Sequence, residues 1–380
     1  MFKYKIHDKF YDLTDFVKIH PGGQDMFNNL KTNTNITAMI YSYHKNPKNI
    51  LSLILPKYEL PMSTDIIKFD TNYTYDKYCE LKKLVYAEMH EKKIPFYWSN
   101  TEIAYNAFML SLYFGVWVYC FWNSDNLSYW WIVLLALMNT GICNLIFHET
   151  AHHCGFKNQT INNCLTMCTY PLMVARFWKY KHNFLHHSFT NTVYDFDFSL
   201  PIVRHSNEQK YNWFNKYQSL YTLFLFQLTA LHEGPFVSLK GRRSYNWVCF
   251  PVLLFVFGVY KTMSWYLLSG LMFTFIAQLS HIQPECIEMN KEKKNDFLYR
   301  EVSSSMNYKT DDQLTRFICF SLDIQIEHHL FPNIPHSSLR KIQHIVRDYC
   351  DKNDIPYVEK SSIFSSIYSY ICYLYKMGNP

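Results

Sequence analysis

The residues of this chain that could do chemistry are histidines gathered in short runs. The segments HETAHH, HNFLHH and QIEHHLFP hold His148, His152, His153, His182, His186, His187, His328 and His329. If these segments are helical, residues at i and i+4, such as His148 and His152, project from one face. Neutral imidazole binds iron, copper, nickel and zinc, so the ligand type alone does not select the metal. The spacing predicts a metal site built from several segments.

The first run also matches H-E-x-x-H, in which two histidines of a zinc protease hold the metal and Glu149 would be the general base. A catalytic zinc takes three protein ligands. The runs, together with His281 in QLSHI, offer far more, and this number suits two metal ions with exchangeable positions. We therefore interpret the protease pattern as incidental. The isolated histidines are expected to be surface or core residues: His7, His90, His205, His232, His336 and His344.

Long uncharged stretches indicate a membrane protein. Segments 103–122, 128–147, 244–260 and 263–284 contain no Asp, Glu, Lys or Arg. Each is long enough to cross a hydrocarbon core about 30 Å thick as a helix. We predict four transmembrane helices in two hairpins. The alternative is a set of buried helices in a large soluble protein.

The distribution of Lys and Arg predicts the orientation. The loops inside the two hairpins hold one Lys between them, whereas both termini and the segment between the hairpins are rich in basic residues. The positive-inside rule then places both termini and all the histidine runs at the cytoplasmic face. The net charge of +6 is attributed to this orientation and to contact with membrane lipid, and no nucleic-acid partner is expected.

The three runs resemble the histidine boxes of the membrane fatty acid desaturases in order and spacing. Gln325, in place of the first histidine of the third box, is similar to the front-end subgroup. The resemblance implies a desaturase domain over 95–350 and a cytosolic tail over 351–380. It also implies O2 as co-substrate and two non-haem irons, held by His148, His152, His153, His182, His186, His187, His281, His328 and His329.

Three further residues inside the boxes are candidates for a role in the reaction. Glu149 and Glu327 could orient ligand imidazoles, the alternative being helix-surface carboxylates. Gln325 offers no imidazole nitrogen, so we expect it near an iron through its amide oxygen or a water. Segments 162–175 and 218–231 are too short to span and are expected at the membrane interface, where they would shape an acyl tunnel.

Residues 1–60 carry a second motif. YDLTDF followed by His20, Pro21, Gly22 and Gly23 resembles the haem-binding signature of cytochrome b5, and His44 follows at about the separation of that family's two axial ligands. The resemblance implies a small, shortened α+β domain with haem b, whose two imidazole ligands suit electron transfer. An ordinary turn at the glycines is the alternative. Residues 61–94 would form a linker and pre-membrane segment.

We therefore predict a mostly α-helical polytopic membrane protein with a cytosolic helical cap and an N-terminal cytochrome b5-like domain. Its expected reaction places a cis double bond toward the carboxyl end of a long acyl chain, carried by CoA or a phospholipid, in the endoplasmic reticulum. Cytochrome b5 reductase or a similar donor would supply electrons. The alternatives are a sphingolipid long-chain-base desaturase, a hydroxylase or conjugase on the same irons, and a membrane-anchored haem protein that only carries electrons.

Overall fold

The computed structural model describes residues 2–24, 26–27, 30–61, 69, 71–169, 172–200, 202–237, 246–287 and 293–379, and of 168–169 and 246–247 only the backbone. These residues are mostly helical, as predicted. The N-terminal part contains β1 (Lys3–Ile6), β2 (Lys9–Asp12), α1 (Thr14–Ile19), β3 (Thr34–Asn35), α3 (Thr37–Tyr43), α4 (Pro47–Asn49) and β4 (Glu59–Leu60). The first half of the remainder contains α5 (Asp76–Glu91), α6 (Asn100–Trp122), α7 (Tyr129–Ile142), α8 (His148–Ala151), α9 (Gln159–Leu165), α10 (Ala175–Lys179), α11 (His187–Phe189) and α12 (Gln218–Leu231).

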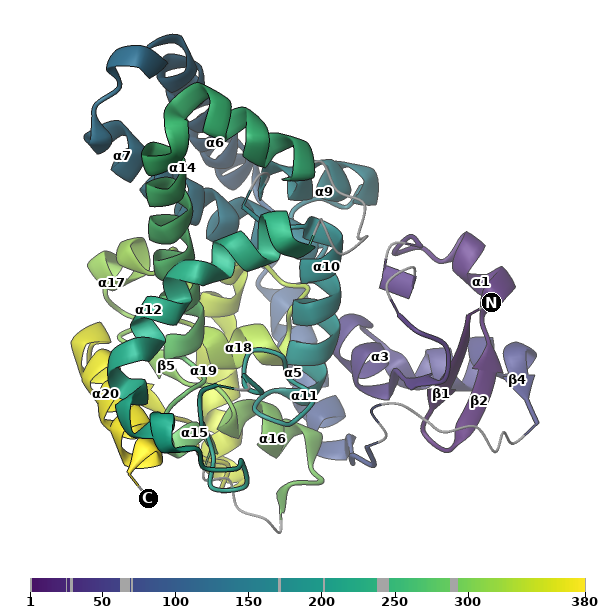
Figure 1. Cartoon of the computed structure of the whole chain (residues 1–380). Coiled ribbons are helices and arrows are strands. Elements are labelled where there is room, and N and C mark those ends of the chain that lie inside the picture. Colours follow the sequence, from purple (N-terminus) through teal and green to yellow (C-terminus); the bar gives the residue numbers. More distant parts are fainter. Residues whose placement is uncertain are drawn as a thin grey trace.

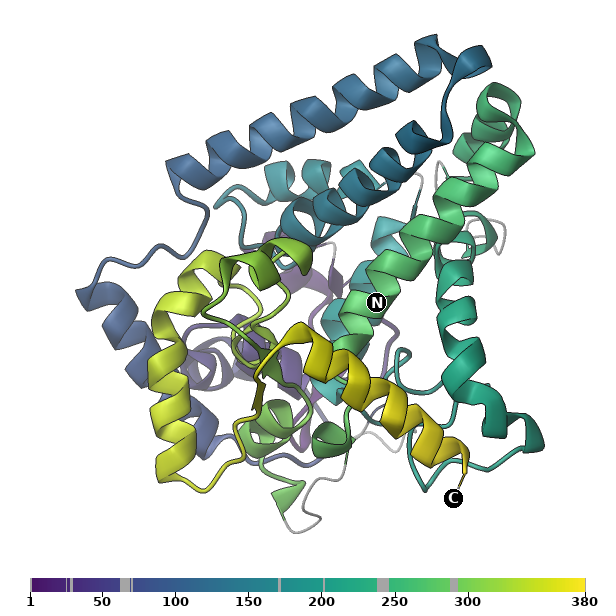
Figure 2. The same ribbon diagram turned by 90° about the vertical axis from the view of Figure 1, so that its left-hand side faces the viewer.

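The second half begins with a long helix and continues with short elements. These are α14 (Asn246–Leu279), α15 (Pro284–Ile287), α16 (Phe297–Ser303), β5 (Asn307–Tyr308), α17 (Gln313–Ile318), α18 (Gln325–Leu330), α19 (His336–Lys352), β6 (Glu359–Lys360) and α20 (Ile363–Gly378). Helices α6, α7 and α14 project together from one side of the molecule, and the short elements gather at their base (Figures 1 and 2).

Within the described residues, three helices are long and apolar enough to cross a membrane: Asn100–Trp122, Tyr129–Ala151 and Val248–Leu279. The first contains the predicted span 103–122, and the second contains the predicted span 128–147 except Ser128, its N-cap. Large apolar side chains such as Trp122, which is 88% exposed, lie on their outer faces, as expected for contact with lipid. Helix α14 contains most of both remaining predicted spans, 244–260 and 263–284. Residues 244–245 lie outside the described residues.

Helix α14 reverses direction within its own length. Gly258 has φ 73° and ψ 171°, a left-handed conformation that costs glycine little. The Thr262 hydroxyl donates to the carbonyl of Leu253 at 2.8 Å. The rings of Phe250 and Tyr266 lie 5.5 Å apart. Residues nine apart in a straight helix are separated by about 13.5 Å, so the two arms of α14 fold back against each other.

The N-terminal part is an α+β unit. Its sheet has the order β3-β1-β2-β4, with β1 antiparallel to β2 and parallel to β3. Tyr4 and Ile6 alternate with more exposed residues along β1 and are buried, as a strand covered on one face requires. The same apolar cluster includes Phe184 and Leu185 of the second histidine run. The unit therefore packs directly against the helical part, beside α10 and α11 (Figure 1).

Candidate metal centre

The first histidine run is positioned by a change in helical geometry. Helix α7 passes into the π-helical segment Cys143–Phe147 and then into α8. Such segments are frequent at functional sites, because the extra residue in the turn redirects the side chains that follow. His148 and His152 are both buried, with ring centroids 4.8 Å apart. The two side chains therefore point inward together.

Four histidines from three segments form a first group. His148 and His152 meet His182 and His328, and one ring nitrogen of each lies within 4.8 Å of the others. Nε2 of His148 lies 3.0 Å from Nε2 of His182. Trp178 stacks on His182 at 4.2 Å between centroids and limits its rotation. Ring nitrogens this close share either a proton or a metal ion.

Three histidines form a second group: His186, His281 and His329, whose ring nitrogens also lie within 4.8 Å of one another. Each Nδ1 has a polar neighbour, so Nε2 is left for a metal. The neighbours are Asp195 Oδ2 at 3.0 Å from His186, the Ser304 carbonyl at 3.1 Å from His281, and Thr190 Oγ1 at 3.3 Å from His329. This pattern is usual for metal-binding histidine, whose second nitrogen is held by a carboxylate, a carbonyl or water.

Two carboxylates lie behind the second group. Besides Asp195, a Glu301 oxygen lies 3.4 Å from Nδ1 of His329. Both side chains are buried. Burial raises the pKa of Glu301 to about 8.

The remaining predicted ligands take different positions. His187 lies between the two groups, with Nε2 3.2 Å from Nε2 of His182 and its ring stacked on His329 at 4.4 Å. His153 lies outside both groups: its φ is 65°, and its Nδ1 is 2.6 Å from Oε1 of Gln159. His153 therefore contacts the first residue of α9.

Glu149 contacts a histidine that the sequence patterns did not single out. One carboxylate oxygen accepts from the backbone N–H of His336 at 2.8 Å and lies 2.7 Å from its Nδ1. The other accepts from Nε1 of Trp98. His336 begins α19, whose first N–H groups have no partner inside the helix, and a carboxylate there is favoured by the helix dipole. Glu149 thus both caps α19 and orients His336.

His336 also lies close to the first histidine group. Its ring stacks on His328 with centroids 5.0 Å apart and lies 5.5 Å from His148. It is buried, which agrees with the expectation of a surface or core residue, but it lies beside histidines of the first group, which the sequence did not indicate. His344, later on the same helix, has a side chain that is 55% exposed, as expected.

The two other residues proposed from the third box, Gln325 and Glu327, make different contacts. Gln325 lies beside the cavity described below, and its Nε2 donates to the carbonyl of Leu322 at 3.2 Å. Glu327 is buried and turned toward Asn307 Nδ2 at 2.8 Å and Tyr357 Oη at 2.7 Å, so its hydrogen bonds go to these groups and not to a box imidazole. Burial raises the pKa of Glu327 to about 7.

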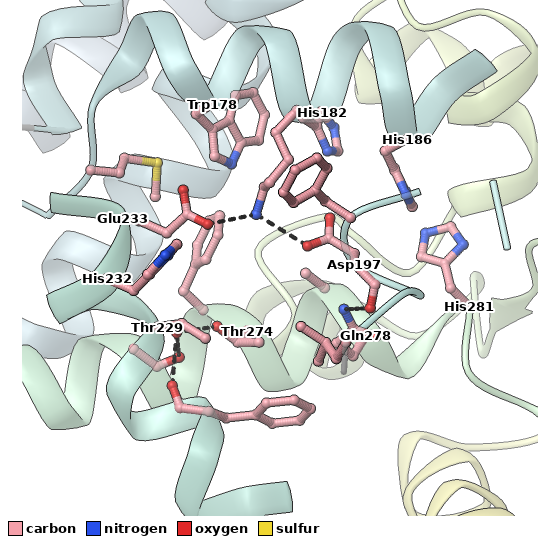
Figure 3. A pocket seen from close by; sticks show the side chains of 18 of the residues that line it. Trp178, His182, His186, Asp197, Thr229, His232, Glu233, Thr274, Gln278 and His281 are labelled. Carbon is pink, nitrogen blue, oxygen red and sulfur yellow. Dashed lines mark hydrogen bonds and ion pairs between the residues drawn. The ribbon is translucent and has the colours of Figure 1, made fainter. Parts of the chain in front are cut away.

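A cavity of about 380 Å³ opens beside the histidines. His182, His186 and His281 line one end of it, and apolar side chains of α12 and α14 line much of its wall (Figure 3). A volume of about 300–1,000 Å³ is typical of small-molecule sites. Segment 218–231, predicted to shape a tunnel, is α12 and does line this cavity.

The cavity also contains one cluster of charge. Lys181 Nζ lies 2.9 Å from Glu233 and 3.1 Å from Asp197 (Figure 3). Burial lowers the pKa of Lys181, but the two carboxylates outweigh it and the net shift is upward. His232 lies next to Glu233 on the cavity wall and is a lining residue, which the sequence did not indicate.

The chemistry of the donor set fits metal ions. Buried ring nitrogens of the site lack a hydrogen-bond partner among the described residues: His148 Nδ1, His152 Nε2, His187 Nδ1, His328 Nδ1 and Nε2, His329 Nε2 and His336 Nε2. Leaving a buried polar atom unpaired costs about 1–3 kcal/mol. So many orphaned imidazole nitrogens directed at one region indicate groups that coordinate metal.

The histidines of the N-terminal unit also face each other. The ring centroids of His20 and His44 are 5.8 Å apart. Their Nδ1 atoms lie 3.3 Å from the Gly23 carbonyl and 3.0 Å from the Ile40 carbonyl, which leaves both Nε2 atoms available. Burial lowers the pKa of His44 to about 4, so it is neutral at pH 7, the form that binds metal. A Cβ at Gly22 would come 2.8 Å from Cε1 of His20, so a larger residue there would displace this ring.

Comparisons with known proteins show what the chain is similar to. The sequence model of the family described as "Fatty acid desaturase" matches residues 126–361. "Probable Delta(5) fatty acid desaturase C" of Dictyostelium discoideum is 23% identical, with 97% of this chain and 90% of the relative aligned. "Acyl-lipid (8-3)-desaturase" of Physcomitrium patens is 25% identical, with 98% and 87% aligned. "Delta(8)-fatty-acid desaturase" of Borago officinalis is 25% identical, with 93% and 85% aligned.

Proposed function

The chain belongs to the fatty acid desaturase family, and from that premise we propose that it inserts a cis double bond toward the carboxyl end of a long acyl chain. One observation carries the proposal: two groups of histidines, all but His182 buried, lie at the end of a largely apolar cavity. The relatives named Delta(5) and Delta(8) desaturases support a position near the carboxyl group.

The two groups are suited to one iron each. His148, His152, His182 and His328 would hold the first, and His186, His281 and His329 the second. His187 is close enough to both groups to serve either, whereas His153 belongs to neither group and is not assigned to an iron. When bound, the two irons supply the oxidation by O2 that removes two hydrogens from neighbouring methylenes.

The protein's own residues prepare the site for that chemistry. Asp195 and the Ser304 carbonyl would fix the proton of His186 and His281 on Nδ1, which leaves Nε2 as the ligand atom. The apolar walls of α12 and α14 would exclude water and hold the acyl chain beside the histidines. Gln325, beside His281 at the cavity, would adjust ligand binding without adding an imidazole.

The N-terminal unit would hold haem b and pass electrons inward. His20 and His44 would be its axial ligands, with Pro21, Gly22 and Gly23 forming the turn beside the haem. The facing imidazoles, with both Nδ1 atoms bonded to carbonyls, support this assignment. Tethering the electron donor to its acceptor raises their effective concentration.

The membrane arrangement follows from the charge distribution and from α14. We propose four spans, in which the two arms of α14 that meet at Gly258 form the second hairpin. Both termini and the histidines would face the cytoplasm, in the endoplasmic reticulum, where a reductase supplies electrons. Residues 1–60 and 95–350 would be the haem and desaturase domains, joined by 61–94 and followed by the tail 351–380.

The test is expression in a yeast that makes no polyunsaturated fatty acids, with candidate acids fed one at a time. Mass spectrometry should find a product two hydrogens lighter than one fed acid, with its new double bond on the carboxyl side. His182→Ala should abolish it, and His344→Ala, a change on exposed α19 surface, should not. A hydroxylated or conjugated product would support the hydroxylase or conjugase, and a changed long-chain base would support the sphingolipid enzyme.

A further inference from the structure

Besides its packing on Phe184 and Leu185, the N-terminal unit is held against the metal-centre region by hydrogen bonds at the end of helix α3. The buried Nζ of Lys82, on α5, donates to the carbonyls of Tyr41, Ser42 and His44, the last at 2.9 Å. Asn333 Nδ2, just after α18, donates to the carbonyl of Tyr43 at 3.0 Å. The last carbonyls of a helix have no partner within it, so these bonds both cap α3 and fix its position.

The Tyr43 side chain reaches from this fixed point into the first histidine group. Its hydroxyl lies 2.8 Å from Nδ1 of His152, and the two rings are nearly parallel, at 15°. Nε2 of His152 is buried without a partner among the described residues. A metal ion on Nε2 would place the imidazole proton on Nδ1, which would then donate to the Tyr43 oxygen. Tyr43 thus has the same relation to His152 as Asp195 has to His186.

The position of Tyr43 in the chain gives this contact a second meaning. The next residue, His44, is one of the two proposed haem ligands. Of the two, it is the closer in sequence to the histidine runs. The connection from His44 to His152 is therefore one peptide unit, one tyrosine side chain and one hydrogen bond. Electrons tunnel more readily along bonds than across gaps, so this connection is a short route between the two redox sites.

We propose that Tyr43 is a positioning residue that fixes the His152 imidazole and carries the electron path from the haem to the metal centre. The inference rests on the proposed haem binding at His20 and His44. Each passage oxidises one ferrous haem to ferric and reduces one ferric ion of the metal centre to ferrous. Two passages accompany each double bond: O2, two substrate hydrogens, two electrons and two protons give two waters. Tyr43 undergoes no net change.

The experiment uses the full-length protein purified with haem and non-haem iron bound. Three forms are compared: wild type, Tyr43→Phe and Tyr41→Phe. Tyr41 is a matched control, because it lies on the same helix but bonds to His7 at 3.1 Å and stacks on Tyr75, away from the metal centre. Haem is reduced in the absence of oxygen, then mixed with O2 and the acyl substrate. Its reoxidation is followed by absorbance, and haem and non-haem iron are measured per chain.

We expect Tyr43→Phe to bind haem normally and to reoxidise it about tenfold more slowly, the lower end of the effect of removing a ligand's hydrogen-bond partner. Tyr41→Phe should match wild type. Loss of iron from part of the molecules would lower the amplitude of the fast phase of haem reoxidation and leave its rate constant unchanged. A purely structural defect can therefore be distinguished from a slower electron transfer.

Two results would overturn the inference in different ways. An unchanged rate constant in Tyr43→Phe, with haem present in the wild type, would refute the electron path and leave the proposed function intact. Wild-type protein without the absorption of a bis-imidazole haem would refute the haem assignment and, with it, the path. The first result includes a change in amplitude alone, which would leave Tyr43 as a structural contact.

Discussion

Replacing Glu149 by alanine would remove the acceptor of three buried hydrogen bonds. The donors are Nε1 of Trp98 and, from His336, the backbone N–H and Nδ1. A buried donor without a partner costs about 1–3 kcal/mol, so Glu149→Ala should lower the free energy of unfolding by roughly 3–5 kcal/mol. Glu149→Gln keeps one carbonyl oxygen but turns an NH2 group toward the other donors, so it should cost about 1–3 kcal/mol.

These losses can be measured as thermal stability in detergent. Each purified variant is heated and the remaining monodisperse protein is measured by size-exclusion chromatography, since unfolding of a membrane protein of this size is rarely reversible. The midpoint should fall by about 5–10 °C for Glu149→Ala and by roughly half as much for Glu149→Gln. Glu88→Gln is the control, because Glu88 faces the same helix α19 at the surface, 3.7 Å from His344.

The order of the variants decides whether the reasoning holds. Glu149→Ala should be the least stable, Glu149→Gln intermediate, and Glu88→Gln within error of wild type. If Glu149→Ala melts together with the Glu88→Gln control, then Glu149 neither caps α19 nor anchors His336, and the description of this network is refuted.

Three further changes test other parts of the site and fold. Asp195→Asn should weaken iron binding about 10–100-fold by disturbing the partner of His186, measured by iron retention during dialysis against a chelator; unchanged retention would exclude this role. Gln325→His should reduce desaturation in the yeast assay, because it adds an imidazole beside the cavity; an unchanged product yield would show that position 325 is tolerant. Gly270→Ala should destabilise the packing of α14 on α12 by about 1–3 kcal/mol, since its Cβ would come 2.7 Å from a carbonyl oxygen of α12. Gly115→Ala, with open space around its Cβ, should not, and equal melting of the two glycine variants would contradict this packing.

The histidine runs could be recognised in the sequence because their residue types and spacing lie within a few consecutive positions. The i, i+4 spacing of His148 and His152 fixes a shared face without knowledge of the fold, and the structure does bring both into the first group with His182 and His328. The length of the uncharged stretches likewise predicted the apolar helices α6 and α7. Family resemblance then supplied the metal and the reaction, which ligand type alone leaves open.

The residues behind the ligands could not be predicted in this way. Glu149 and His336 are 187 positions apart in the chain, and Tyr43 and His152 are 109 apart. No periodicity links such pairs, since only the fold brings residues of α19 and α3 close to the first histidine run. Asp195 follows the second run without any recognisable spacing, and the sequence does not show whether an isolated histidine such as His336 lies at the surface, in the core or beside the metal centre.

The central claim, a two-iron desaturase, is tested most directly by metal analysis of the purified full-length protein. The account predicts two non-haem irons per chain by mass spectrometry of the metals, with a Mössbauer spectrum of nitrogen-ligated high-spin iron. His328→Ala should lose iron, whereas His344→Ala, on the exposed face of α19, should retain it. A single zinc per chain, or no non-haem iron in protein that desaturates its substrate, would contradict the account.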